Sequence, residues 1–304
     1  MRFRSPANIL LRRAQLVLIL AAVVPTILMT ATGIILLVVG QGSVAIVAGS
    51  LVLAFCTSSL TGFLLGSMFV RRGASLARVQ TDFLSSVSHE FRTPITSIRM
   101  FIETLRDGRV TDPVEQQRCL RIVGQEMERL DGLVGKLLEL SRIEAGRQPF
   151  ERRPVKVRPL IDEALTGLAA VRMGREVNLE VEVDETLEVL GDKAALGQVF
   201  VNLLVNAWKY TPAENKCITI RVYAQKKHVV FDIEDNGDGI PPDERKFIFD
   251  TFERGRSAIE SGTQGSGLGL AIVRAITRAH GGDVQLIGGT AGACFRVRLP
   301  RRTS

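Results

Sequence analysis

The sequence contains one long stretch without any charged residue, from Ala14 to Val70, and this stretch excludes a purely soluble protein. A single membrane crossing needs about 20 apolar residues, so the stretch is long enough for two crossings. Gly40 to Ser43 form a short run that is typical of a tight turn. We therefore expect two transmembrane helices, at about residues 14–39 and 44–70, with Pro25 tolerated inside the first.

The positions of the basic residues predict how these helices are oriented. Arginines flank the outer ends of the pair, whereas the connecting turn has none. By the positive-inside rule both termini should be cytoplasmic, and residues 1–13 should form a short cytoplasmic N-terminus. A cleavable signal peptide is the competing interpretation, although the first apolar run is about twice as long as such peptides require. Gly62 and Gly66 form a GxxxG pattern that could let helices approach closely, or could be ordinary span glycines.

Charge and cysteine content exclude further classes of function. Four of the 39 basic residues precede the apolar stretch, and the remaining ones nearly balance the 32 acidic residues. The formal net charge of +7 is therefore no sign of binding to nucleic acid, and we expect no such partner. The four cysteines lie far apart without a CxxC pair, which indicates neither a zinc site nor a disulfide scaffold.

Two amphipathic helices should follow the apolar stretch. Apolar residues recur with the helical period from Leu76 to Leu105 and again from Val114 to Leu140. Between them, Asp112 is placed to cap the second helix and Pro113 to open it. Two helices joined by a short turn cannot bury both apolar faces alone, so we expect a homodimer that completes a four-helix bundle.

His89 lies on the polar face of the first of these helices, where it should face solvent. An exposed histidine is usually unremarkable, but residues 88–94 (SHEFRTP) resemble the H box of sensor histidine kinases at every position. Imidazole titrates near neutral pH, so a neutral ring nitrogen can attack phosphorus. The adjacent Glu90 could hold the other ring N–H or accept its proton.

Thr93 lies one turn after His89 on the same helical face. In the family that the H box resembles, the residue at this position orients water for dephosphorylating the partner. The resemblance therefore implies a phosphatase activity, with a plain solvated hydroxyl as the alternative.

The pattern changes after a segment at 146–159 that contains three prolines and several arginines, which we interpret as a linker. Beyond it, periodicity predicts a mixed α/β layer. Strands are expected at 178–183, 217–223, 228–233 and 294–299, and helices at 157–170, 193–210 and 268–280.

Residues 198–210 resemble the N box of the ATP-binding domain that histidine kinases share with gyrase. Asn202 and Asn206 lie on one helical face, and amide oxygens are hard ligands that suit Mg²⁺ carried with a nucleotide. The resemblance points to Asn206 as the main metal ligand with Asn202 close by, to Lys209 as a phosphate contact and to Tyr210 as a neighbour of the adenine. ATP-hydrolysing relatives have a glutamate where Asn202 stands, so its absence favours phosphoryl transfer over hydrolysis.

The segment from Asp235 to Ile240 (DNGDGI) follows an apolar strand and resembles the DxGxG motif. A carboxylate at Asp235 can accept the adenine amino proton, while Gly237 and Gly239 let the backbone approach the base. A turn or a cation loop is the alternative, but an EF-hand would need a glutamate at position 246, where lysine stands. Residues 249–254 (FDTFER) resemble the F box at the base of a lid.

A glycine-rich segment precedes the last predicted helix. Gly265, Gly267, Leu268 and Gly269 can offer free amides and a helix N-terminus to anionic phosphate. Residues 257–267 are rich in glycine and serine, and we expect a flexible lid there. His228 and His280 are interpreted as structural residues.

These motifs, in this order, resemble a bacterial two-component sensor histidine kinase with a HisKA-type dimerisation domain and a GHKL-type ATP-binding domain. The resemblance implies ATP and Mg²⁺ as cofactors, a response regulator as partner and a multi-pass protein of the bacterial inner membrane. The fold class is a membrane protein that combines α with α/β structure. The expected domains are 14–70 (two membrane helices), 71–148 (helical hairpin) and 149–304 (α/β sandwich that binds ATP).

Two features depart from many relatives. Too few residues separate Val70 from His89 for the helical HAMP relay, and we expect no extracytoplasmic sensor domain. We therefore expect the spans to sense the lipid bilayer or a membrane-protein partner. The alternatives are a GHKL-type ATPase, which would need a glutamate at position 202, and a catalytically silent scaffold, which would show broken motifs.

Overall fold

The computed structural model describes residues 6–172, 175–212, 214–256, 265–288 and 292–302, without the side chains of 6–22 and 69–83. Most of the predicted lid at 257–267 therefore lies outside the described residues. The chain forms two compact units, Met1–Asp82 and Phe83–Ser304.

The first unit consists of α1 (Pro6–Val39) and the N-terminal part of α2 (Ser43–Arg106). The predicted turn is confirmed: Gly42 has φ +101°, a left-handed conformation that favours glycine. The two helices approach closely at Gly33 and Gly49, since a Cβ on Gly49 would lie 3.0 Å from the Gly33 carbonyl oxygen. Within the described residues a Cβ at Gly62 or Gly66 would meet nothing within 4 Å.

Among the described residues, Ser43–Met68 is both long and apolar enough to cross a membrane. The apolar part of α1 over which side chains are described, Val23–Val39, is shorter. Pro25 lies inside α1 without ending it, as expected.

The second unit begins with a helical hairpin formed by the C-terminal part of α2 and by α3 (Pro113–Glu144). The predicted start of α3 is confirmed, because the Asp112 side chain accepts a hydrogen bond of 3.2 Å from the backbone N–H of Val114. Much of the apolar surface of the hairpin is left uncovered. Exposed apolar residues include Leu84, Ile95, Met100, Ile102, Val114, Leu120, Met127 and Val134.

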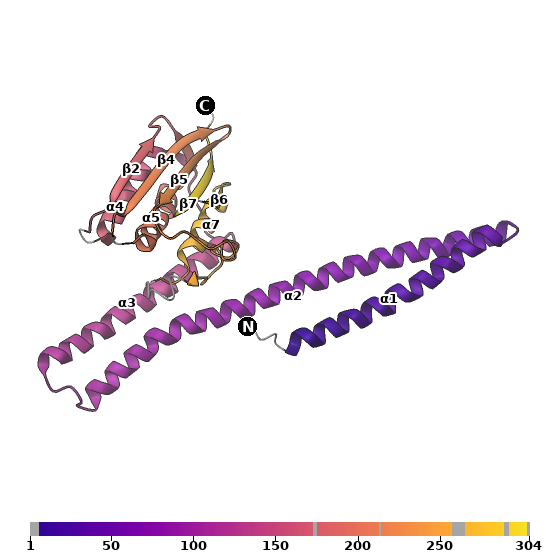
Figure 1. The fold of residues 1–304 in the computed structure, drawn as a ribbon, viewed down its shortest axis with the longest axis horizontal. Helices are drawn as coiled ribbons and strands as arrows, with labels where there is room; N and C mark the ends of the chain where they lie inside the picture. Colours follow the sequence, from indigo (N-terminus) through magenta and orange to yellow (C-terminus); the bar gives the residue numbers. More distant parts are fainter. Residues whose placement is uncertain (1–5, 173–174, 213, 257–264, 289–291, 303–304) are drawn as a thin grey trace. The chain divides into compact units, whose positions relative to one another are not determined.

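The rest of the unit is an α/β domain whose five-stranded sheet has the order β2-β4-β5-β7-β6. β2 pairs with β4 in parallel, and the other neighbours are antiparallel. The helices α4, α5 and α7 lie on one face of this sheet (Figure 1). The bounds are α4 Val157–Arg172, β2 Asn178–Val183, α5 Lys193–Tyr210, β4 Cys217–Gln225, β5 His228–Asp235, α7 Gly269–Ala279, β6 Asp283–Gly288 and β7 Ala293–Pro300.

The structure corrects the expected linker at 146–159. Strand β1 (Arg153–Lys156) lies inside it and pairs antiparallel with β3 (Glu188–Gly191), and α4 begins at Val157. Pro154 lacks an N–H, but it is tolerated because β1 belongs to a two-stranded sheet and has only one partner strand. The sequence pattern also missed β3 and β6, which have four and six residues.

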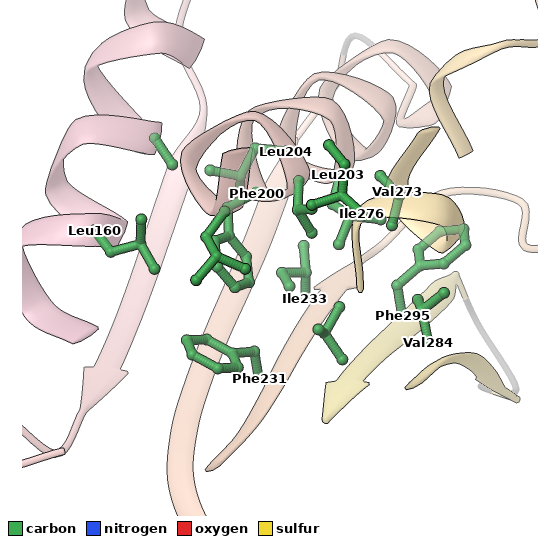
Figure 2. Close-up of a cluster of buried hydrophobic side chains, with 14 of the residues drawn as sticks. Leu160, Phe200, Leu203, Leu204, Phe231, Ile233, Val273, Ile276, Val284 and Phe295 are labelled. Atoms are coloured by element: carbon green, nitrogen blue, oxygen red, sulfur yellow. The ribbon is translucent and has the colours of Figure 1, made fainter. Parts of the chain in front are cut away.

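The core of the α/β domain lies between the sheet and its helices (Figure 2). Phe200 of α5 and Phe231 of β5 are both fully buried, and their ring centroids lie 4.5 Å apart. Ile276 of α7 and Val284 of β6 extend this cluster toward the far edge of the sheet. Burial of this apolar surface is the main favourable contribution to folding of the domain.

We expect Phe200→Ala to lower the free energy of unfolding of the α/β domain by about 3–5 kcal/mol, because it leaves a cavity in a fully packed core. Phe247 is 51% exposed, so Phe247→Ala is the matched control and should cost less than about 1 kcal/mol. Urea unfolding followed by fluorescence measures both, since the only tryptophan, Trp208, lies in α5. Equal losses for the two variants would contradict the prediction.

Candidate functional site

The residues of the predicted H box lie on α2, in the hairpin part of the second unit. His89 and Thr93 are exposed and one helical turn apart, and Glu90 is partly exposed beside them. Pro94 lies inside the same helix, so the carbonyl of Glu90, four residues earlier, loses its usual N–H partner. The segment thus presents an accessible imidazole next to a carboxylate and, one turn on, a hydroxyl.

The predicted N box occupies all of α5 after its first five residues. The helix begins at an Asp192 cap, whose Oδ1 accepts hydrogen bonds from the N–H groups of Ala194 and Ala195. Asn202 donates from Nδ2 to the Gln198 carbonyl at 3.0 Å, which leaves its Oδ1 facing the start of α7. Asn206 lies one turn further along the same side and is partly exposed.

The predicted DxGxG motif begins at the last residue of β5. Asp235 is almost fully buried, and its Oδ1 accepts hydrogen bonds from the N–H groups of Gly237 at 3.0 Å and Ala293 at 3.1 Å. Burial raises the pKa of Asp235, and these two hydrogen bonds act in the opposite direction. The carboxylate is therefore held in a fixed orientation at the end of the strand.

Gly237 and Gly239 lie so close to other backbone atoms that a side chain would not fit at either position. A Cβ on Gly237 would lie 2.6 Å from the backbone oxygen of Tyr210, at the end of α5. Gly239 has φ +72°, and its Cβ would lie 2.8 Å from the Gly292 oxygen. Ile240 follows, partly buried against the core, and its carbonyl accepts a hydrogen bond from Arg245.

The glycine-rich segment also lies beside α5, near Asn202 and Tyr210. A Cβ on Gly265 would lie 3.6 Å from the Tyr210 hydroxyl, and one on Gly269 would lie 3.5 Å from the Asn202 Oδ1. Gly267 has φ +65° and packs directly on the backbone of Phe252, in the predicted F box. Leu268 is the N-cap of α7 but offers no side-chain cap, so the first amides of this helix remain available to an anion.

Lys209 and Tyr210 close the C-terminal end of α5. Burial lowers the pKa of Lys209, and the positive charge of Lys136 on α3 lowers it further. Burial also raises the pKa of the Tyr210 hydroxyl, although the ring is 39% exposed. The effect of Lys136 means that Lys209 lies within electrostatic range of the hairpin helix α3, which the motif alone did not predict.

The structure thus brings together the predicted N box, the DxGxG motif and the glycine-rich segment, around Tyr210 and the end of β5. Among the described residues, no hydrogen bond links His89, Glu90 or Thr93 to this site, although Phe91 of the H box packs against the same buried cluster as α5 and α7. Gly292 and Ala293 were missed from the sequence. Gly292 has φ +94°, and its Cβ would lie 1.8 Å from the Asp235 carbonyl oxygen, so this neighbour of Asp235 must be glycine.

The hairpin also contacts the α/β domain away from the H box. Gln198 of the N-box helix donates to the Glu139 carboxylate of α3 at 3.0 Å. Leu133, Leu140 and Ile143 of α3 belong to the same buried cluster as α7.

Comparison with known proteins agrees with this arrangement. Residues 79–146 match the family described as His Kinase A (phospho-acceptor) domain, and residues 191–303 match the family described as Histidine kinase-, DNA gyrase B-, and HSP90-like ATPase. The two matched segments contain the H box and the nucleotide motifs, respectively.

Two curated proteins are similar over most of the chain. The probable sensor histidine kinase TcrY of Mycobacterium tuberculosis is 36% identical over 220 residues, which cover 72% of this chain and 45% of that protein. The phosphate regulon sensor protein PhoR of Pseudomonas aeruginosa is 34% identical over 211 residues, which cover 69% and 47%. The chain thus spans less than half the length of either relative.

A solved structure is similar as well. The histidine kinase ThkA, in complex with the response regulator protein TrrA, aligns with a TM-score of 0.60 and 25% identity, over 76% of this chain and 65% of that one. With both family matches in one chain and the same arrangement in a solved kinase, the chain belongs to the family of two-component sensor histidine kinases.

Proposed function

We propose that this chain is an ATP-dependent protein-histidine kinase that phosphorylates its own His89 and passes the phosphoryl group to an aspartate of a separate response regulator. The observation that carries the proposal is the convergence of Asn202, Asp235, Gly237 and Gly269 on one corner of a domain whose hairpin presents an exposed histidine. The relatives named as sensor kinases support it, and so does the solved complex of ThkA with a regulator.

The residues present fit an adenine nucleotide. The hydrogen bonds that the Asp235 carboxylate accepts from described residues all go to Oδ1. This leaves Oδ2 for the adenine amino group. Gly237 lets the backbone after Asp235 pass close to the Tyr210 carbonyl, where a Cβ would lie 2.6 Å from the oxygen. The uncapped start of α7 after Gly267 offers backbone amides to phosphate.

The same corner suits a magnesium ion that enters with the nucleotide. The Oδ1 of Asn202 is not used by the helix, and Asn206 presents a second amide on the same side of α5. We assign Asn206 as the principal Mg²⁺ ligand with Asn202 beside it, because Mg²⁺ prefers oxygen ligands. Lys209 contacts phosphate and Tyr210 lies against the adenine in this assignment. Since position 202 holds no carboxylate that could activate water, transfer is favoured over the hydrolysis of a GHKL-type ATPase.

On the hairpin, a neutral ring nitrogen of His89 attacks the terminal phosphorus of ATP. A nitrogen–phosphorus bond forms, the bond to the bridging oxygen breaks and ADP leaves. Glu90 holds or accepts the proton of the imidazole, which is consistent with its place next to His89. Thr93, exposed one turn later, orients water for removal of the phosphoryl group from the regulator.

We propose that 14–39 and 44–70 both cross the bacterial inner membrane, with both termini cytoplasmic, and that residues 71–148 and 149–304 form the phosphotransfer hairpin and the catalytic domain. The Ser43–Met68 segment and the close approach at Gly33 and Gly49 support a pair of spans. The uncovered apolar side chains of α2 and α3 support a homodimer. The spans then sense the bilayer or a membrane-protein partner.

We expect His89→Gln to abolish acid-labile labelling of the full chain by γ-labelled ATP with Mg²⁺, because the amide is no nucleophile for phosphorus. The wild-type chain and the His228→Gln control should be labelled, and all three should bind ATP alike. Label that persists in His89→Gln would overturn the assignment of His89. No label in the wild type despite bound ATP would favour the silent scaffold.

We expect Gly237→Ala to weaken binding of a fluorescent ATP analogue by about tenfold or more, because the new Cβ would lie 2.6 Å from the Tyr210 oxygen. Gly124→Ala is the matched control: a Cβ there meets nothing within 4 Å, so affinity should stay within about twofold. Titration by fluorescence anisotropy measures both. Unchanged affinity in Gly237→Ala would place the nucleotide elsewhere.

The two-span arrangement predicts that only the turn between the spans reaches the outside. We expect Gln41→Cys to react with a membrane-impermeant maleimide added to intact spheroplasts. The parent chain, with its four native cysteines in the span or the cytoplasm, should not react until the cells are opened. Labelling of the parent from outside, or protection of position 41, would contradict this topology.

A further inference from the structure

His280 is buried at the end of α7, where both ring nitrogens are engaged by the backbone. Nδ1 lies 2.8 Å from the Ile276 carbonyl oxygen, and Nε2 lies 3.1 Å from the backbone nitrogen of Asp192. Because a carbonyl can only accept and an N–H can only donate, Nδ1 carries the proton and Nε2 accepts. The ring is therefore held neutral, in one tautomer.

Three segments that are distant in the sequence meet at this ring. The Phe150 ring, in the connection from α3 to β1, packs on it with centroids 4.9 Å apart. In the same connection, Glu151 donates its N–H to Asp192 Oδ2 at 3.3 Å, and Arg152 donates to the Ala279 carbonyl at 3.2 Å. The other two segments are the cap of α5 at Asp192 and the end of α7.

Each of these segments is continuous in the chain with an element that carries residues of the proposed kinase site. The connection at Phe150 continues the hairpin that carries His89, α5 carries the predicted N box, and α7 begins at the glycine-rich segment. The packing leaves little freedom: a Cβ on Gly191, just before the α5 cap, would lie 2.8 Å from His280 Cδ2. A change at the ring must therefore shift the connection, the cap or both.

We propose that His280 is a positioning residue that fixes the connection from the phosphoacceptor hairpin onto the ends of α5 and α7, and so sets how productively the α/β domain presents nucleotide to His89. The proposal rests on the proposed kinase function and goes beyond it. His280 lies at the ends of α5 and α7 opposite to those that carry Tyr210 and Gly269, so its effect falls on transfer rather than on nucleotide binding.

The geometry also makes the junction sensitive to protons. Burial lowers the pKa of His280; the Ile276 carbonyl and the Asp192 carboxylate act in the opposite direction, and Arg152 lowers the pKa further. In the unfolded chain histidine titrates near pH ~6.5. Because the unfolded state then binds the proton first, the stabilisation is complete above this pH and is lost as the pH falls below it.

The kinetic test compares His280→Leu, which removes both hydrogen bonds, with His280→Gln, whose side-chain oxygen can still accept from Asp192. His228→Gln, on the exposed first residue of β5, is the matched control. With the full chain in detergent, we expect His280→Leu to lower kcat for His89 phosphorylation about tenfold or more with KM for ATP within about twofold. His280→Gln and the control should stay within about threefold of the wild type.

Three results would overturn the proposal: a wild-type kcat in His280→Leu, a loss confined to KM, or no rescue by His280→Gln. Should His280→Leu fail to fold, Phe150→Leu carries the test, since it should lower kcat with an unchanged KM, and a normal kcat would overturn the proposal. An unlabelled wild type would instead refute the kinase function, so the two failures are distinguishable. As the pH falls from about 7.5 to 5.5, the urea midpoint of the wild type should fall relative to that of His280→Gln; parallel midpoints would overturn the proton sensitivity.

Discussion

The candidate site depends first on the burial of one face of α5 against the sheet. Phe200 and Leu203 are fully buried on that face, and Phe200 packs on Phe231 of β5. Since a helix has a fixed period, this packing places Asn202 and Asn206 on the partly exposed flank of α5 and brings the end of the helix over the end of β5. Asp235 then needs only the register of β5 with its neighbours to reach its place.

The regular parts of this fold could be predicted because their patterns are local. Alternating residues predicted β2, β4, β5 and β7, and helical periodicity predicted α5. The segment from Arg153 to Lys156 lies in the region whose prolines and arginines predict a linker. It becomes a strand through pairing with Glu188–Gly191, a partner that lies more than thirty positions later in the chain.

In the candidate site, too, some residues could be predicted from the sequence and others could not. Its motif residues are contiguous in the sequence and could be predicted, whereas Gly292 and Ala293 acquire their role only where β7 begins beside the end of β5. His280 is buried with both ring nitrogens on backbone groups, but the sequence gives no sign that Phe150 and Asp192 converge on it. How the membrane helices receive a stimulus stays a prediction, because the motifs describe chemistry and not its trigger.

Because apolar side chains of the hairpin are uncovered, the stability of the hairpin should depend on the concentration of the protein. Leu120 and Met127 remain 60% and 57% exposed in one protomer, so much of the hydrophobic stabilisation of α3 is gained only when a second hairpin covers them. The folded fraction of such a protein depends on how often two copies meet. Tethering by the proposed spans confines that search to two dimensions and raises the effective concentration. Attachment to the membrane would then stabilise the hairpin even when no stimulus is present.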